Sequence, residues 1–322
     1  MQPIEPISID AIYAARNRIS GAAIRTPLIP LDVHESLPDI WLKLECLQSI
    51  GSFKIRGAAN AMALADPKEL AGGVYTGSAG NMAQGVAFNA KRLGIPCRVI
   101  VPDTAPQTKL DAIARLGATA VPLPFDEWWA VLRDHGHPDE RGFFVHPVSD
   151  PSVIAGNGTI GLEIVEDLPN VATVVVPFGG GGLSCGIASA MRSLRPDVPV
   201  YAAEVDTAAP LAASLLAGAP VDVSRLPSFV DGIGGSGLLP EMWPLASSLL
   251  AGSLVVTTQE ICEAIRTLVK EAHIVAEGAG AASLAAVLKG VPQAREGPVV
   301  AVISGGNLDP RALTTILDDG IP

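Results

Sequence analysis

The stretch Thr173-Val-Val-Val-Pro-Phe-Gly-Gly-Gly-Gly-Leu183 decides how this chain folds. Its first half is apolar and β-branched, which predicts a buried strand over 173–177, and the apolar run over 183–194 predicts a buried helix. The four glycines between them let the backbone approach an anion closely, and the first N–H groups of a helix attract phosphate. We therefore predict a strand–loop–helix unit with a phosphate-binding loop at Gly179 to Gly182.

The same region raises the question of a membrane span. Residues 171–191 carry no charge over 21 positions, a length that could cross a bilayer. Pro177 and the glycines argue against a continuous helix there. We expect no membrane-spanning segment.

Composition and net charge limit the classes of molecule that this protein could bind. The chain has 322 residues, 48% of them hydrophobic, and a formal net charge of -11, which excludes general attraction to nucleic acid or anionic membranes. Its four cysteines form no CxxC pair and are typical of reduced, buried thiols. The first residues lack the features of a secretory signal. We expect a cytoplasmic protein with no nucleic-acid or membrane partner.

Strands and helices alternate along most of the chain, which implies right-handed βαβ crossovers and parallel sheets. We predict an α/β fold with two doubly wound open parallel sheets: a large lobe of residues 1–71 and 148–322 and a small inserted lobe of residues 72–147. A ligand is expected between the lobes, at the carboxyl ends of the strands. The strands are expected at 40–45, 74–76, 97–102, 120–123, 143–145, 173–177, 198–203, 253–256 and 298–303, and the helices at 8–20, 55–63, 82–93, 107–116, 158–168, 183–194, 210–217, 258–271 and 279–288.

Lys54 lies between Phe53 and Ile55, at a predicted loop-to-helix junction. A lysine among apolar neighbours usually rests its stem on apolar surface and keeps its ammonium in water. A desolvated lysine instead has a lowered pKa, attacks carbonyls and forms Schiff bases. This segment alone leaves both interpretations open.

Two further loops and several single acids could take part in a site. Thr76-Gly-Ser-Ala-Gly-Asn81 could bind a carboxylate or simply cap a helix, and the hydroxyl in Ser304-Gly-Gly-Asn307 could bond a heteroaromatic nitrogen or belong to a turn. The acids that could serve a metal or a cofactor are Glu204, Asp206 and Glu277.

An alternative uses the glycine loop differently. Gly180-x-Gly182-x-x-x-Gly186, followed by a strand that ends in Glu204, is similar to a dinucleotide fingerprint with its ribose-binding acid. Its spacing differs from G-x-G-x-x-G, and it leaves Lys54 without a role. A nicotinamide-dependent oxidoreductase is therefore the alternative from another class.

Four segments follow one another along the chain: Ser52-Phe-Lys-Ile-Arg-Gly57, Ser78-Ala-Gly-Asn-Met-Ala-Gln-Gly85, Gly179-Gly-Gly-Gly-Leu183 and Ser304-Gly-Gly-Asn307. In this order they resemble the pyridoxal-phosphate enzymes of fold type II, which have the tryptophan synthase β-like fold, and specifically the serine/threonine dehydratase and serine racemase group. His146-Pro, residues 153–159 and residues 276–280 strengthen the resemblance, which covers about residues 26–307.

The resemblance implies a homodimeric lyase in which Lys54 binds pyridoxal 5'-phosphate covalently and later removes the Cα proton. It implies elimination of water from a 3-hydroxy amino acid such as L-threonine or L-serine, followed by release of a 2-oxo acid and ammonia. It assigns the cofactor to Phe53, Lys54, Asn81, Gly179, Gly180, Gly181, Gly182, Leu183, Glu277 and Ser304, and the substrate to Ser78, Ala79, Gly80, Asn81 and Met82.

Four positions depart from the family pattern, one of them Asn157, which stands where glutamine is common. Racemases of the group have a second serine where this chain has Ala79, and racemisation needs a proton donor on each face of the substrate, so elimination is favoured over an amino-acid racemase. Met82 replaces a histidine, which leaves larger substrates such as 3-hydroxyaspartate or phenylserine open. The divalent cation site of the group retains Glu204 and the Ala208 carbonyl, but Pro210 replaces its usual acid. A non-catalytic binding relative is the last alternative.

Overall fold

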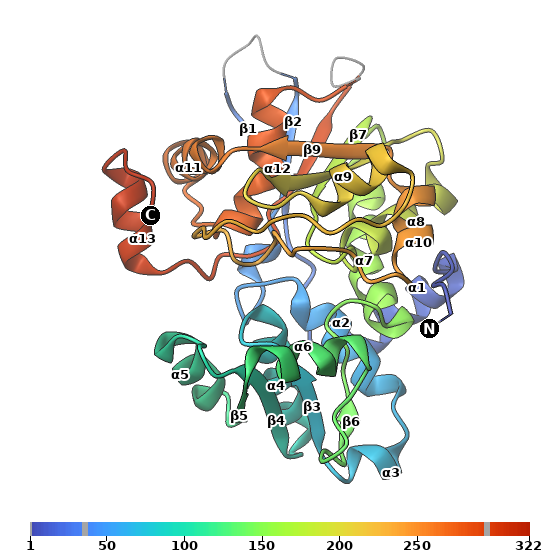
Figure 1. Cartoon of the computed structure of the whole chain (residues 1–322). Helices are drawn as coiled ribbons and strands as arrows, with labels where there is room; N and C mark the ends of the chain where they lie inside the picture. The colour runs from blue at the N-terminus through green and yellow to red at the C-terminus, as the bar shows by residue number, and fades with distance from the viewer. Residues whose placement is uncertain (1, 34–37, 293–296) are drawn as a thin grey trace.

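The computed structural model describes residues 2–33, 38–292 and 297–322, and it contains two sheets that form two lobes (Figure 1). The six-stranded sheet has the order β1-β2-β10-β7-β8-β9, and the four-stranded sheet has the order β5-β4-β3-β6. Every neighbouring pair is parallel except β1 with β2. The predicted α/β fold with two doubly wound parallel sheets is confirmed, and β1 adds an antiparallel edge strand.

The strands of the large sheet are β1 (Leu28–Leu31), β2 (Ile40–Lys43), β7 (Thr173–Pro177), β8 (Val200–Val205), β9 (Gly252–Val256) and β10 (Val299–Val302). The strands of the small sheet are β3 (Val74–Gly77), β4 (Cys97–Pro102), β5 (Thr119–Leu123) and β6 (Phe143–Phe144). The lobe boundaries at residues 72 and 148 stay a prediction.

Helices cover both faces of the large sheet, and further helices pack on the small sheet (Figure 1). One face of the large sheet packs against α1 (Ile9–Arg18), α7 (Pro151–Asp167), α8 (Ser184–Leu194), α9 (Pro210–Ala217) and α10 (Trp243–Leu249). The other packs against α11 (Thr258–Thr267), the π-helix η2 (Leu268–Ala272), α12 (Gly278–Lys289) and α13 (Pro310–Leu317). The remaining helices are the 3₁₀ turn η1 (Glu45–Leu47), α2 (Lys54–Leu64), α3 (Pro67–Leu70), α4 (Asn81–Leu93), α5 (Gln107–Arg115) and α6 (Phe125–Arg133).

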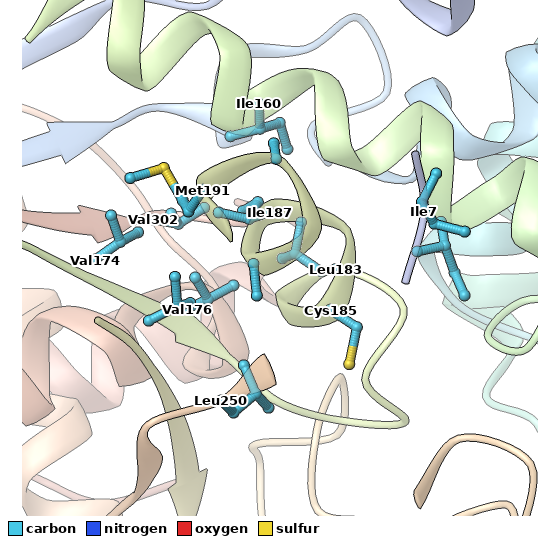
Figure 2. Packing of buried hydrophobic residues seen from close by; sticks show 14 of the residues in the cluster. Ile7, Ile160, Val174, Val176, Leu183, Cys185, Ile187, Met191, Leu250 and Val302 are labelled. Carbon is cyan, nitrogen blue, oxygen red and sulfur yellow. The ribbon is translucent and has the colours of Figure 1, made fainter. Parts of the chain in front are cut away.

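The central strands are buried on both faces because their residues alternate between two hydrophobic clusters. Val174 and Val176 of β7 belong to one cluster, and Val175 belongs to the other. Figure 2 shows the first cluster, in which Ile187 and Met191 of α8 lie beside Val174 and the β10 residue Val302. This packing fixes α8 against the sheet, so the glycine loop before it has a fixed place.

The segment 171–191 forms β7, the glycine loop and most of α8, as predicted. No helix in the described part of the chain is long and apolar enough to cross a membrane. All four cysteines are buried and unbonded, as expected.

Helix α7 starts earlier than the sequence predicted. It begins at Pro151 rather than at residue 158, with the Asp150 carboxylate accepting from the backbone N–H of Ser152. Glycines such as Gly156 lower helix propensity, but a Cβ at Gly156 would lie 2.6 Å from the Arg56 carbonyl oxygen. Close packing of α7 on α2 therefore requires the glycine and overrides its propensity.

Candidate functional site

Lys54 is the first residue of α2, and its amine contacts the segment between β6 and α7. Its Nζ donates a hydrogen bond to the Pro147 carbonyl oxygen at 2.8 Å and lies 5.2 Å from the centroid of the Phe53 ring. No carboxylate of the described residues lies within ion-pair distance of this amine. Desolvation lowers the pKa of Lys54 to about 8, against a smaller opposing effect of the Glu277 charge. A nucleophilic amine is therefore available near neutral pH.

The glycine loop connects β7 to the N-terminus of α8. Gly181 has a φ of +95°, and a Cβ at Gly180 would lie 2.5 Å from a Val148 side-chain methyl. The backbone N–H groups from Gly179 to Leu183 donate to no acceptor within the ranges that the structure describes. These free N–H groups, directly before a helix, form a site suited to a phosphate.

Ser304 follows β10, the strand next to β7. Its side chain is buried, and its hydroxyl makes no hydrogen bond to any described residue. The Phe53 N–H donates to the Ser304 carbonyl at 3.0 Å, and Ser52 forms a bridge with Gly305. The hydroxyl is thus held beside the Lys54 segment, with its hydrogen-bonding capacity unused.

Asn81, at the start of α4, is fixed by two polar contacts from the large lobe. Its Nδ2 donates to Glu277 Oε1 at 2.7 Å, and its Oδ1 accepts from Asn307 Nδ2 at 2.7 Å. Burial raises the pKa of Glu277 to about 7, although the Asn81 bond opposes this shift. The orientation of the Asn81 amide is therefore fixed, because both its nitrogen and its oxygen are hydrogen-bonded.

The loop at the carboxyl end of β3 carries the predicted substrate residues. The Ser78 hydroxyl accepts from the Gly80 N–H at 3.2 Å, and the Ala79 methyl packs against the small-lobe core. Met82 is buried within that core rather than exposed to the site. Four of the five predicted residues, 78–81, are therefore partly exposed, whereas Met82 is buried.

Comparison with known proteins decides the family. A family model described as pyridoxal-phosphate dependent enzyme matches residues 19–305. The chain belongs to this family. Over 321 residues it is 40% identical to the L-threonine ammonia-lyase of Thermotoga maritima, covering 98% of this chain and 79% of the relative.

Solved structures of pyridoxal-phosphate enzymes have the same fold. Maize serine racemase superposes with a TM-score of 0.88 at 30% identity, covering 98% of each chain. A threonine deaminase from T.th. has a TM-score of 0.86 at 33% identity, covering 94% of this chain and 99% of the other. The resemblance to fold type II pyridoxal-phosphate enzymes is thereby confirmed.

The residues present fit pyridoxal phosphate. The cofactor has an aldehyde, a phosphate and a pyridine nitrogen, and the site offers the reactive amine of Lys54, the free N–H groups of the glycine loop and the unused hydroxyl of Ser304. In this family, therefore, these three elements would hold the three parts of the cofactor.

Glu204 lies apart from these groups. Its carboxylate oxygens accept from the backbone N–H groups of Leu211 and Ala212 at 2.9 and 2.8 Å and from the Ser253 hydroxyl at 2.5 Å. This acid therefore caps α9. No group of three or more His, Cys, Asp or Glu that could hold a metal occurs among the described residues, and the cation site at Glu204 and Ala208 stays a prediction.

The sequence did not single out several residues that complete the site. The Pro147 carbonyl contacts Lys54, and Val148 packs on the glycine loop. Asn157, noted in the sequence only as a replacement for glutamine, donates through Nδ2 to the Gly182 carbonyl at 3.1 Å. Asn307 was noted only as the end of a motif, yet it fixes Asn81. A backbone carbonyl has no sequence signal, whereas the His146-Pro pair did point to this segment.

Proposed function

We propose that this chain catalyses the pyridoxal-phosphate-dependent elimination of water from L-threonine or L-serine, with release of a 2-oxo acid and ammonia. The observation that carries the proposal is the Lys54 amine, which has a carbonyl but no carboxylate partner among the described residues and a pKa of about 8. The names of the relatives, L-threonine ammonia-lyase and threonine deaminase, support the choice of reaction.

Lys54 would act twice. As an amine it would hold the cofactor, and after displacement by the substrate amine it would take the Cα proton. The bound cofactor supplies an electron sink for the charge that develops at Cα. The Pro147 carbonyl lies 2.8 Å from Nζ and would orient the freed amine.

The other residues would bind and orient. The Gly179 to Leu183 loop would hold the phosphate, Phe53 and Asn81 would contact the ring, and the Ser304 hydroxyl would bond the ring nitrogen without charging it. Glu277 would act through Asn81, to which it is bonded. The substrate carboxylate would bind the loop over 78–81, which leads directly into the N-terminus of α4.

Racemisation is the second candidate, because serine racemase is among the closely similar structures. Ala79 argues against it. Its side chain is a methyl that packs on the small-lobe core, so it cannot deliver a proton to the substrate face opposite Lys54. We therefore propose that the chemistry at Cα takes place on one face.

Several finer points belong to the same proposal. 3-Hydroxyaspartate and phenylserine stay alternative substrates, although Met82, the residue that suggested them, is buried in the small-lobe core. A homodimer and a weakened divalent cation site at Glu204 and Ala208 are expected from the family, and a cytoplasmic location is expected from the cysteine pattern.

A substrate panel tests the proposal. L-threonine, L-serine, 3-hydroxyaspartate and phenylserine would each be incubated with the holoenzyme while 2-oxo acid, ammonia and the two amino-acid enantiomers are measured. We expect 2-oxo acid and ammonia in equal amounts from threonine or serine, and little D-amino acid. Formation of D-serine faster than pyruvate would support racemisation, and no product from any of the four would contradict the proposed lyase.

A further inference from the structure

His146 is a buried histidine whose tautomer is fixed by its neighbours. Its Nδ1 lies 3.0 and 2.8 Å from the backbone nitrogens of Val148 and Ser149, which can only donate. Its Nε2 lies 3.0 Å from the Leu132 carbonyl oxygen, which can only accept. The ring is therefore neutral, with its proton on Nε2.

The surroundings of His146 oppose its protonation. The side chain is buried and stacks on the His135 ring, with centroids 4.1 Å apart. Burial, followed by the charges of His135 and Lys54, lowers the pKa of His146 to about 3, although the Leu132 carbonyl and the Glu241 charge act in the opposite direction. A proton on Nδ1 would also break both bonds from the backbone.

Those two bonds close a turn over residues 146–149, and the turn contacts the site at two points. The Pro147 carbonyl accepts from Lys54 Nζ at 2.8 Å. The Val148 side chain packs where a Cβ of Gly180 would lie, and its carbonyl oxygen is 2.9 Å from the Cβ position of Gly182. One side chain, His146, thus sets the backbone that touches both the amine and the glycine loop.

A hydrolytic triad next to His146 can be excluded on geometry. The Ser149 hydroxyl and Glu241 Oε1 lie 3.1 and 3.2 Å from the same nitrogen of His135, Nε2. A triad needs the serine and the acid on opposite ring nitrogens. Ser149, His135 and Glu241 therefore form a polar contact between the small lobe and the segment before α10, not a second active site.

We propose that His146 is a positioning residue for Lys54: as a neutral acceptor it closes the turn that holds the Pro147 carbonyl at the Lys54 amine and Val148 against the glycine loop. This inference rests on the proposed role of Lys54. The His146 ring makes no hydrogen bond to Lys54 or to the glycine loop, so in this proposal it acts through Pro147 and Val148.

The test measures the pKa of the Lys54 amine in the full-length, cofactor-free protein by competitive labelling with acetic anhydride across pH, quantified on the Lys54 peptide. The variants are His146→Leu, which removes the acceptor, and His146→Asn, whose Oδ1 can take the place of Nδ1. Without the Pro147 carbonyl the ammonium form loses a partner, so the pKa in His146→Leu should fall about one unit below that of the wild type. His146→Asn should restore it.

The direction of the shift separates positioning from general loosening. If the leucine variant merely opens the site, water enters and the pKa of Lys54 rises towards its ordinary value. Either a rise or an unchanged pKa in a folded His146→Leu protein would overturn the proposal. Cofactor release from the holoenzyme provides a second readout: it should be faster in His146→Leu and in Val148→Ala, and unchanged in His146→Asn.

The wild-type protein allows a test that needs no leucine variant. With ¹⁵N-labelled histidine, the ring nitrogens of His146 should report a bare Nδ1 and a protonated Nε2 from pH 5 to 8, roughly the range in which an ordinary histidine titrates. Titration in that range, or a proton on Nδ1, would overturn the proposal. If borohydride reduction labels Lys54 but the pKa does not move, only the role of His146 fails; if Lys54 is not labelled, the proposed function fails.

Discussion

Lys43 and Lys54 are two lysines of the interior with opposite surroundings. Lys43, at the end of β2, donates to Glu163 Oε2 and to the Thr26 carbonyl, each at 2.6 Å, and its side chain is fully buried. Lys54 donates to the Pro147 carbonyl, and its pKa is lowered to about 8. A buried amine with a carboxylate partner remains a structural cation, whereas a desolvated amine without one becomes a nucleophile.

Lys43 belongs to a buried ion-pair network that also includes a residue of α2 close to Lys54. Arg56, two residues after Lys54 on α2, bonds Glu45 at 2.8 Å and Glu163 at 2.7 Å. Two cations and two carboxylates, all of them buried, thus balance one another. The network ties β2, η1, α2 and α7 together, so it fixes the start of the helix that presents Lys54.

The largest effect is expected from Lys54→Ala. The variant should lose covalently bound cofactor, and turnover should fall roughly 10²- to 10⁴-fold or more, because the base at Cα is gone. Lys43→Met is the matched control, since it removes an interior amine outside the site. Visible absorbance measures the bound cofactor and 2-oxo acid release measures turnover in both variants. An active Lys54→Ala protein would contradict the claim that Lys54, unlike Lys43, is the reactive amine.

Glu163→Gln should lower the stability of the protein without changing the reactivity of Lys54. It leaves Lys43 and part of Arg56 buried without a full charge partner, so the free energy of unfolding should fall by about 3–5 kcal/mol. Urea unfolding measures this loss. The folded variant should still carry its cofactor on Lys54, and a stability equal to that of the wild type would show that the network is not needed.

Much of the fold and part of the site follow from the sequence. Long apolar runs such as 173–177 identified the buried strands, and the position of Lys54 at a helix start was predicted correctly. The start of α7 was not, because the glycines of that helix lower its helix propensity and are explained only by close packing on α2. Asp150 at the N-cap and Pro151 at the first helical position are ordinary signals of a helix start that our prediction did not use. The charges of Lys43, Glu45 and Arg56 look like surface residues in sequence, and only the fold brings them together.

The pH dependence of cofactor attachment tests whether Lys54, in contrast to Lys43, is a reactive amine near neutral pH. Below the pKa of Lys54, which is about 8, the reactive amine becomes protonated. The rate at which pyridoxal phosphate binds to cofactor-free protein should therefore fall about tenfold for each pH unit below the pKa and level off above it. Stopped-flow absorbance measures this rate. A profile centred near pH ~10 would mean that Lys54 is an ordinary hydrated lysine.

The smallest effect is expected from Glu277→Gln. The Glu277 charge raises the pKa of Lys54 and so works against desolvation. Its removal should lower the pKa of Lys54 and speed cofactor attachment at pH 8, where Glu277, with a pKa of about 7, is mostly ionised in the wild type. The gain is at most about twofold, because about half of the Lys54 amine is already neutral at that pH. The same stopped-flow assay measures the change, and the amide can still accept from Asn81. A higher pKa in this variant would contradict the assigned direction.

Reduction of the holoenzyme with sodium borohydride, followed by proteolysis and mass spectrometry, tests the central claim most directly. Borohydride converts the Schiff base between cofactor and lysine into a stable secondary amine, so the attachment point can be identified. We predict a single phosphopyridoxyl group, on the peptide that contains Lys54. A label on Lys43 or on any other lysine, with Lys54 unmodified, would contradict the account.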